Sequence, residues 1–229
     1  MNKPLCVVVG IGPKNGAAFA RRFHKAGYRV ALVSRQTEYS ETLAKELGDA
    51  KAYACDASEP DSIKTTFATI REEMGDPDVL VYNAGSGSWK KFEETTAKDL
   101  EGAFRLNALG MVMASQEVLP AMRKAKKGSI VIVGATASLR GKPMTTGFAA
   151  AKAAQRSLAQ SMARQFWPEG IHVTLLILDG VVGEEGSSKT GAIDKLDPND
   201  IAHAAWQVTE QPPSTWTFEL DIKPKSENW

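Results

Sequence analysis

The stretch VVVGIGPKNGAAFARRF, Val7 to Phe23, decides the fold of this chain. An apolar run ends at Gly10, and Gly12 and Gly16 follow before a segment with helical spacing begins. Glycines between a strand and a helix permit a tight turn and let the backbone approach a pyrophosphate, which the positive helix N-terminus attracts. A lone glycine pattern is weak, but this strand–turn–helix setting predicts a dinucleotide site.

Apolar runs like the first recur and are nearly continuous, which is typical of strands buried on both faces of a parallel sheet. They are Leu5–Gly10, Tyr28–Ser34, Ala50–Cys55, Asp78–Ala84, Gly128–Ala135 and Ile171–Gly180, with a last strand at Trp216–Leu220. The predicted helices are Gly16–Ala26, Thr37–Leu47, Pro60–Glu73, Ala97–Lys124, Phe148–Trp167 and Asp200–Gln207.

This alternation predicts a single α/β domain over residues 1–229, a doubly wound Rossmann fold with a seven-stranded parallel sheet in the order 3-2-1-4-5-6-7. The segment 183–198 is polar and rich in glycine, and follows the sixth strand. Loops of this length in a compact domain are often lids, so we expect a substrate lid here.

Composition excludes several classes of function. With 229 residues and a net charge of +1, the chain has the size of one domain and no field that would attract nucleic acid or an anionic membrane. No apolar segment approaches the roughly 20 residues that span a bilayer. The two cysteines, Cys6 and Cys55, have neither metal spacing nor the spacing of a redox pair, which suits buried thiols in a reducing compartment. We therefore expect a soluble cytoplasmic protein without a metal.

The residues at the end of the second strand indicate which nicotinamide cofactor the site prefers. A NAD site usually carries an acid about 20 residues beyond the glycines, where it binds the ribose 2′-hydroxyl. This chain has Ser34 and Arg35 there, and Lys14 lies in the glycine turn. Positive side chains suit a 2′-phosphate. We favour NADP, with NAD as the alternative, although each charge alone could be a solvated surface residue.

Five motifs in register extend this interpretation over most of the chain. The glycine turn is followed by CDAS with Asp56, YNAG with Asn83, LNALG with Asn107, and FAAAK with Lys152. In this order they resemble the short-chain dehydrogenase/reductase family. The resemblance implies that Asp56 holds the adenine, that the Asn-Ala-Gly segment supports the central strands, and that Val182 meets the nicotinamide carboxamide. The predicted cofactor-binding residues are Gly10, Gly12, Lys14, Asn15, Gly16, Ser34, Arg35, Asp56, Ala57, Asn83, Ala84, Gly85, Lys152 and Val182.

The resemblance also implies a catalytic set of asparagine, serine, tyrosine and lysine. Asn107 and Lys152 match two of these positions, but Ala135 falls at the serine position and Phe148 at the tyrosine position. A further departure is Glu184, where the family often has a threonine near the phosphates; a carboxylate would repel a pyrophosphate unless its loop points away. Each of these residues has a simpler explanation too: Asn107 could mark a helix kink, Lys152 could be half of a surface ion pair, and Phe148 could be core.

Phenylalanine has no proton to give to a carbonyl oxygen. General acid catalysis is worth about 10² to 10⁴-fold, so ketone reduction by the family's usual route should be slow. Thr136 and Thr145 are candidate substitutes, either orienting an oxygen or relaying a proton from Lys152. A small-molecule aldehyde or other carbonyl, or an enone, is the expected substrate class.

The alternative is a catalytically inactive NADP-binding protein that senses redox state or assembles with partners. In both cases, the helices Ala97–Lys124 and Phe148–Trp167 resemble those through which family members form dimers and tetramers. We therefore expect a homodimer or homotetramer.

Overall fold

The computed structural model describes residues 3–184, 186 and 195–227. A seven-stranded sheet lies at its centre, and all strand pairs are parallel in the order β3-β2-β1-β4-β5-β6-β7. The strands are β1 (Leu5–Val9), β2 (Arg29–Ser34), β3 (Ala50–Ala54), β4 (Val79–Tyr82), β5 (Gly128–Ala135), β6 (Ile171–Leu178) and β7 (Glu219–Ile222). The predicted strand order is confirmed.

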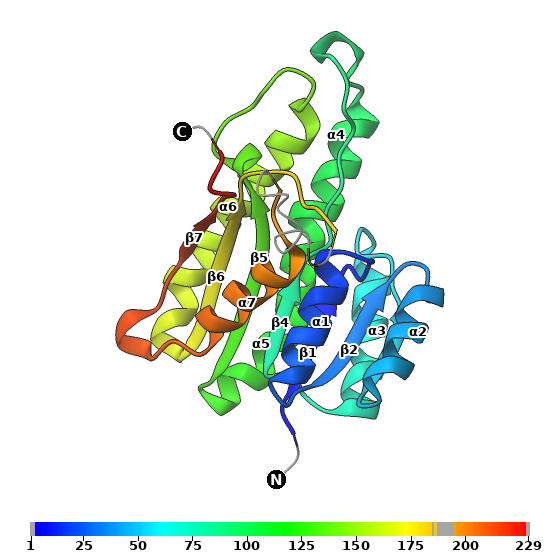
Figure 1. Cartoon of the computed structure of the whole chain (residues 1–229), viewed down its shortest axis with the longest axis vertical. Helices are drawn as coiled ribbons and strands as arrows, with labels where there is room; N and C mark the ends of the chain where they lie inside the picture. The colour runs from blue at the N-terminus through cyan, green and yellow to red at the C-terminus, as the bar shows by residue number, and fades with distance from the viewer. Residues whose placement is uncertain (1–2, 185, 187–194, 228–229) are drawn as a thin grey trace.

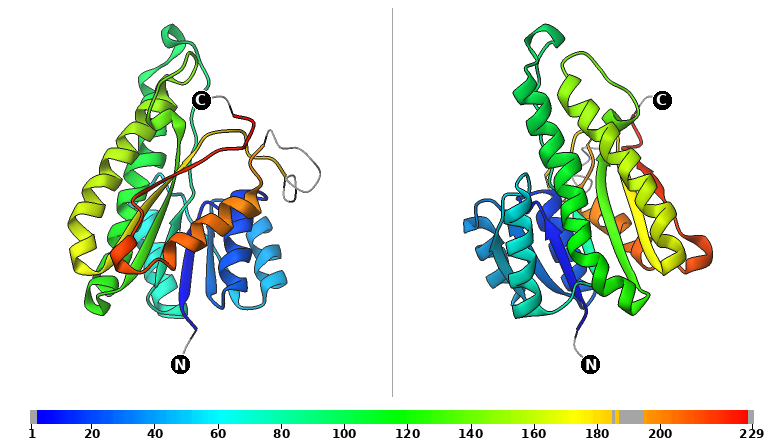
Figure 2. Two further views of the ribbon diagram at one scale, coloured as in Figure 1. Left: turned by 60° about the vertical axis from the view of Figure 1, so that its left-hand side comes forward. Right: turned by 180° about the vertical axis from the view of Figure 1, so that it is seen from behind.

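Helices cover both faces of this sheet (Figures 1 and 2). They are α1 (Asn15–Lys25), α2 (Glu38–Leu47), α3 (Pro60–Met74), α4 (Ala97–Phe104), α5 (Gly110–Ala125), α6 (Thr146–Phe166) and α7 (Pro198–Thr209). Side chains of α1, α2 and α7 share one apolar core, and those of α3, α5 and α6 share the other. β1 and β4 contribute to both cores, which explains why their sequences are apolar without alternation.

The prediction of one long helix at Ala97–Lys124 was wrong in one respect. A π-helical turn, Arg105–Leu109, separates α4 from α5. The amide of Gly110 donates to the carbonyl of Arg105, five residues back. The carbonyl of Leu106 thereby loses its regular donor, and the hydroxyl of Tyr82 donates to it at 2.5 Å. A π turn of this kind often marks a functional site, and Asn107 lies inside it.

The last elements also differ from the prediction. β7 begins at Glu219 and not at Trp216, because the backbone of Thr217 bonds to the side chains of Gln211 and Thr174 before the strand pairing starts. α7 begins earlier than predicted, at Pro198, where the Asp197 side chain caps it. The lid predicted at 183–198 lies largely outside the described residues. No described helix combines the length and apolarity required to cross a membrane.

Candidate active site

A cavity of about 560 Å³ opens where the carboxyl ends of β1, β2 and β4 meet the start of α1. It is lined by Val9, Gly10, Ile11, Gly12, Pro13, Lys14, Asn15, Gly16, Val33, Ser34, Arg35, Cys55, Ala57, Asn83, Ala84, Gly85, Ser86, Leu106 and Val182. Most of the predicted cofactor-binding residues are in this lining. Asp56 and Lys152 are not, although both neighbours of Asp56 are.

The glycine turn gives this cavity its shape. Gly10 has φ +96°, and a Cβ there would lie 2.5 Å from the amide nitrogen of Ala84. A Cβ on Gly16 would lie 2.5 Å from the carbonyl oxygen of Gly10. Gly12 is different, since a Cβ there meets no atom within 4 Å. The chain therefore requires Gly10 and Gly16 for its own packing and leaves the space beside Gly12 open.

The residues around the glycine turn fit a dinucleotide phosphate. α1 begins at Asn15 without a side-chain cap and has no acid in its first turn. Oδ1 of Asn15 is buried and has no hydrogen-bond partner within the described residues. An uncapped helix N-terminus is a site where an anion is stabilised by backbone N–H groups and by the helix dipole.

Charged side chains surround the outer part of the cavity. Arg35 is exposed at its edge, directly after β2. Lys14 does not point freely to solvent: its ammonium donates to the carbonyl of Val182 at 3.2 Å and pairs with Glu184 at 3.1 Å. The negative charge of Glu184 is thus offset by a lysine, so its conflict with a pyrophosphate is smaller than the sequence suggests.

Asp56 has partners of its own. Its Oδ1 accepts hydrogen bonds from the amide of Ser58 at 2.9 Å and from the hydroxyl of Ser58 at 2.6 Å. These bonds, with a smaller contribution from Arg35, hold the pKa of Asp56 below its usual value. The carboxylate is therefore ionised near neutral pH, as an acceptor for a ligand amine must be.

Lys152 and Asn107 do not line the cavity themselves but lie directly behind Gly85, which does. A Cβ on Gly85 would be 2.9 Å from Oδ1 of Asn107 and 3.3 Å from Nζ of Lys152. Lys152 is only 5% exposed, and this burial lowers its pKa to about 7. The Lys152 ammonium donates to the carbonyl of Val133 at 2.9 Å. An amine that changes protonation state near neutral pH thus lies behind the lining of the cavity.

The amide of Asn107 is held on one side only. Nδ2 donates to the carbonyl of Ser86 at 2.6 Å and to that of Ala103 at 2.8 Å. Oδ1 is buried and accepts no hydrogen bond from any described residue. A buried acceptor without a donor is costly, so the oxygen of Asn107 marks a place where a ligand or water would bind.

Ala135 and Phe148 occupy the neighbourhood of this lysine. Ala135 is the last residue of β5, and Phe148 lies one helical turn before Lys152 on α6. The ring centroid of Phe148 is 5.8 Å from Nζ of Lys152. This side of the site therefore offers a methyl group and an aromatic ring, neither of which can donate a proton to an oxygen.

The two threonines proposed as substitutes are engaged elsewhere. The hydroxyl of Thr136 is buried and donates to the carbonyl of Leu178 at 3.1 Å. The hydroxyl of Thr145 donates to the carbonyl of Lys142 at 2.8 Å and accepts from the amide of the same residue. The structure does not bring either hydroxyl to Lys152 by a hydrogen bond, so neither has the contact that a relay would need.

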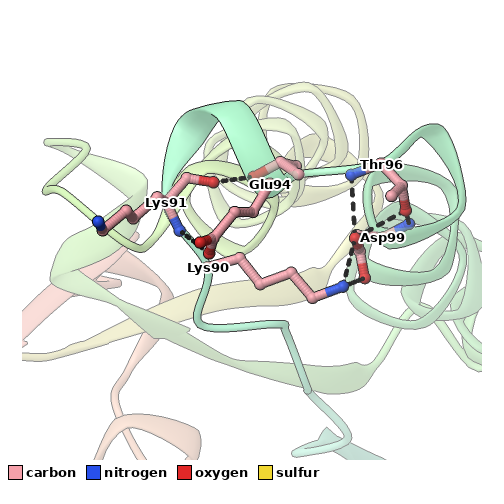
Figure 3. Close-up of polar contacts among 6 residues, drawn as sticks. Lys90, Lys91, Glu94, Thr96 and Asp99 are labelled. Atoms are coloured by element: carbon pink, nitrogen blue, oxygen red, sulfur yellow. Dashed lines mark hydrogen bonds and ion pairs between the residues drawn. The ribbon is translucent and has the colours of Figure 1, made fainter.

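Phe148, which lies beside Lys152, belongs to an aromatic pair. Trp89, on the segment after β4, packs on Phe148 with ring centroids 5.2 Å apart. Next to it, Lys90 binds both carboxylate oxygens of Asp99 on α4, at 2.9 and 3.0 Å, and Figure 3 shows this pair beside the cap that Thr96 forms with Asp99. The backbone of Lys90 also forms an isolated parallel β-bridge with the backbone of Thr145. The loop that carries Trp89 is therefore attached to both helices beside it.

Sequence reasoning missed one residue of this site. Gln155 lies three residues after Lys152, is fully buried, and binds both Lys152 and Asn107 through its side chain. A polar amide on the face of a helix that also carries a functional lysine was the signal available in the sequence. Within the described ranges, no group of three or more His, Cys, Asp or Glu side chains could hold a metal ion.

The known proteins that resemble this chain agree with the family that the sequence motifs indicated. The family model described as short chain dehydrogenase matches residues 5–195. A 3-oxoacyl-[acyl-carrier-protein] reductase of Bos taurus is 28% identical over 217 residues, which cover 91% of this chain and 92% of that protein. Carbonyl reductase family member 4 of Xenopus laevis is 25% identical over the same shares.

Solved structures agree with these relatives on the fold. The crystal structure of a short-chain dehydrogenase from Rhodopseudomonas palustris superposes with a TM-score of 0.86 at 29% identity, over 98% of this chain and all of the other. An alcohol dehydrogenase from the archaeon Thermococcus sibiricus, complexed with 5-hydroxy-NADP, has a TM-score of 0.88 at 23% identity and 99% coverage of both chains.

Proposed function

The chain belongs to the short-chain dehydrogenase family, and on this basis we propose that it is an NADPH-dependent reductase of an apolar carbonyl or enone, in which Lys152 replaces the missing phenol as the proton donor. The observation that carries this proposal is the position of Lys152 and Asn107 directly behind Gly85, a lining residue of the cavity that the glycine turn shapes. A nicotinamide cofactor bound there would supply the hydride.

The preference for NADPH rests on the outer part of the cavity. Arg35 stands at the end of β2, where a carboxylate would select a ribose 2′-hydroxyl, and its guanidinium suits a 2′-phosphate. Lys14 is paired with Glu184, so Arg35 supplies most of this selectivity. Asp56 would hold the adenine and Val182 the nicotinamide carboxamide.

Lys152 has the properties of a proton donor near neutral pH. A general acid works best when its pKa lies near the working pH, and burial lowers the pKa of Lys152 to about 7. The ammonium would give one proton to the substrate oxygen as the hydride reaches the adjacent carbon, and would be left as a neutral amine. Asn107 would orient an oxygen-bearing group through its amide.

The substrate side of the site is apolar. The segments after β4, β5 and β6 carry large exposed apolar side chains: Trp89, Phe92, Leu139, Met144 and Val181. These segments follow the carboxyl ends of the strands, the end of the sheet at which the cavity opens, and exposed apolar groups there suit the binding of an apolar substrate. An aromatic or alkyl-substituted aldehyde or enone fits this lining better than a sugar or a charged acid.

The alternative is an inactive NADP-binding sensor or assembly protein, and the loss of a serine and a tyrosine at Ala135 and Phe148 favours it. Titration of the protein with NADPH and with NADH, followed by fluorescence, comes first. We expect NADPH to bind more tightly, and Arg35→Ala to reduce this difference while Arg164→Ala, far from the cavity, does not. A panel of aldehydes and enones then separates the two functions, since binding without turnover supports the sensor.

We also propose that the chain works in the cytoplasm as a homodimer or homotetramer. Cys6 and Cys55 are free and buried, as expected for a reducing compartment. α4 exposes the apolar side chains of Leu100 and Phe104, and it packs beside α6. A second copy covering this pair of helices would remove these side chains from water.

A further inference from the structure

Gln155 connects the two side chains on which the proposed chemistry depends. Its Oε1 accepts a hydrogen bond from the ammonium of Lys152 at 3.0 Å, and its Nε2 donates to the carbonyl oxygen of Asn107 at 2.8 Å. Gln155 and Asn107 are fully buried, and Lys152 nearly so. Each end of the Gln155 amide therefore has a partner inside the protein.

The chemistry of the partners determines how the amide is oriented. An ammonium has only donors and a carbonyl has only acceptor lone pairs. The reverse orientation of the amide would place its NH₂ against the ammonium and its oxygen against the Asn107 carbonyl. Both contacts would then be repulsive, so Gln155 is suited to these two partners in one arrangement only.

Gln155 also completes a continuous set of hydrogen bonds across four elements. From β5, the carbonyl of Val133 accepts from Lys152 on α6. Gln155 continues from Lys152 to the backbone of Asn107 in the π turn, and the Asn107 side chain continues to Ser86 after β4. A shift of any member would leave a buried polar group without a partner, which is unfavourable, so the set holds its members in place.

We propose that Gln155 is a positioning residue: it holds the Lys152 ammonium beside Gly85 of the cavity lining, so that two of its three N–H groups are occupied and the third has no acceptor among the described residues. Within the described part of the chain, two acceptors bind this ammonium, the oxygens of Val133 and Gln155. The remaining N–H is the one that the proposed function would use, so this role rests on that function for its purpose.

The groups facing Lys152 are neutral, so the effect of the Gln155 amide on the pKa of Lys152 can be measured without interference from a nearby charge. They are the Val133 carbonyl from β5, the Phe148 ring from α6 and the Asn107 amide from the π turn. Burial is the cause that lowers the pKa of Lys152 to about 7, and no charged side chain contributes. An acceptor at Gln155 favours the charged amine, and a carboxylate at the same place would favour it more.

The test measures the pKa of Lys152 and does not depend on turnover. Protein labelled with ¹³C at lysine Cε is titrated by NMR, with the Lys152 signal assigned from its absence in Lys152→Met. We expect Gln155→Leu to lower the pKa of Lys152 below that of the wild type. Gln155→Glu, which keeps the size of the side chain, should raise it by more than about one unit. Gln160→Leu, on the same helix, is the control and should leave it unchanged.

Opposite shifts would not follow from a loss of packing alone, and circular dichroism checks that each variant is folded. If Gln155→Leu does not fold, Gln155→Glu still decides. A folded Gln155→Glu whose Lys152 titrates as in the wild type would overturn the proposal. Turnover separates the two ideas: shifts of this pKa without reduction of any substrate would refute the proposed function and leave the positioning role intact.

Discussion

The ring centroid of Phe148 lies 5.8 Å from the ammonium nitrogen of Lys152, one helical turn away, with no hydrogen-bonding group on the ring. The side chain next to Lys152 on this face of α6 therefore has no proton to donate. Tyrosine differs from phenylalanine by one hydroxyl, so Phe148→Tyr would add a donor with little change of shape.

Adding hydroxyl groups at Ala135 and Phe148 should raise the rate of carbonyl reduction. For Phe148→Tyr combined with Ala135→Ser we expect a gain of about 10²-fold or more in kcat/KM with an aromatic aldehyde and NADPH, because a phenol and a hydroxyl would reach the substrate oxygen. Oxidation of NADPH followed by absorbance measures this. Phe218→Tyr, which adds a hydroxyl at a position outside the cavity lining, is the control. An unchanged rate in a double variant that still binds NADPH would mean that substrate binds elsewhere.

The pH dependence should identify Lys152 as the acid. Its pKa is lowered to about 7, and a general acid must be protonated to act, so kcat should be highest below this pH and fall as the pH rises through it. Lys152→Met should lose most activity and this descending limb together. A limb that persists in Lys152→Met would assign the proton to another group.

Gly12 should be needed for the cofactor and not for the fold. Its Cβ position is empty within 4 Å and its φ is not positive, so Gly12→Ala should change the free energy of unfolding by less than about 0.5 kcal/mol. The added methyl group would occupy the space of the pyrophosphate and weaken NADPH binding about tenfold or more. Thermal unfolding and fluorescence titration measure the two effects.

The matched variant for this prediction is Gly10→Ala. A Cβ at Gly10 would lie 2.5 Å from the backbone of Ala84, in a backbone conformation that L-residues rarely adopt. Gly10→Ala should therefore lower the thermal midpoint clearly. If Gly12→Ala binds NADPH as the wild type does, the cofactor does not lie against this turn.

Lys90 should act on substrate binding through the loop of Trp89. Its bond to Asp99 holds the pKa of that carboxyl well below its usual range, so the pair stays ionised across the working pH. Lys90→Met should raise KM for an aromatic aldehyde several-fold, because Trp89 would no longer be held against Phe148. The pair lies near the surface and is screened by solvent, so global stability should barely change.

The control for this loop is Lys91→Met, since Lys91 is exposed and adjacent. NADPH affinity should be unchanged in both variants. Equal KM values for Lys90→Met and the wild type would show that the Trp89 loop does not contact substrate.

Oligomer formation should depend on the exposed face of α4. Phe104 is 46% exposed there, and Phe104→Asp should shift a dimer or tetramer toward the monomer, because it would place a charge in an apolar contact. Small-angle scattering measures the mass. Tyr39→Asp, on α2, is the control. A wild type that is already monomeric would contradict the proposed assembly.

Local patterns in the sequence were sufficient for the frame. The glycine turn, the uninterrupted apolar runs and their alternation with helical segments predicted the sheet and its order, and structure confirmed them. The four-residue spacing of Phe148 and Lys152 placed both on one face of α6, because helical periodicity is a property of neighbouring residues.

Local sequence patterns could not predict the contacts between segments that lie far apart in the sequence. Gln155 binds Asn107 across 48 positions, and Tyr82 takes the carbonyl of Leu106 and so stabilises the π turn that broke the predicted helix. The sequence by itself determined which elements form, since these follow from local periodicity, and their alternation indicated a doubly wound fold class, which has a characteristic strand order. Only the tertiary structure decided which donor meets which acceptor, because that depends on how the elements pack.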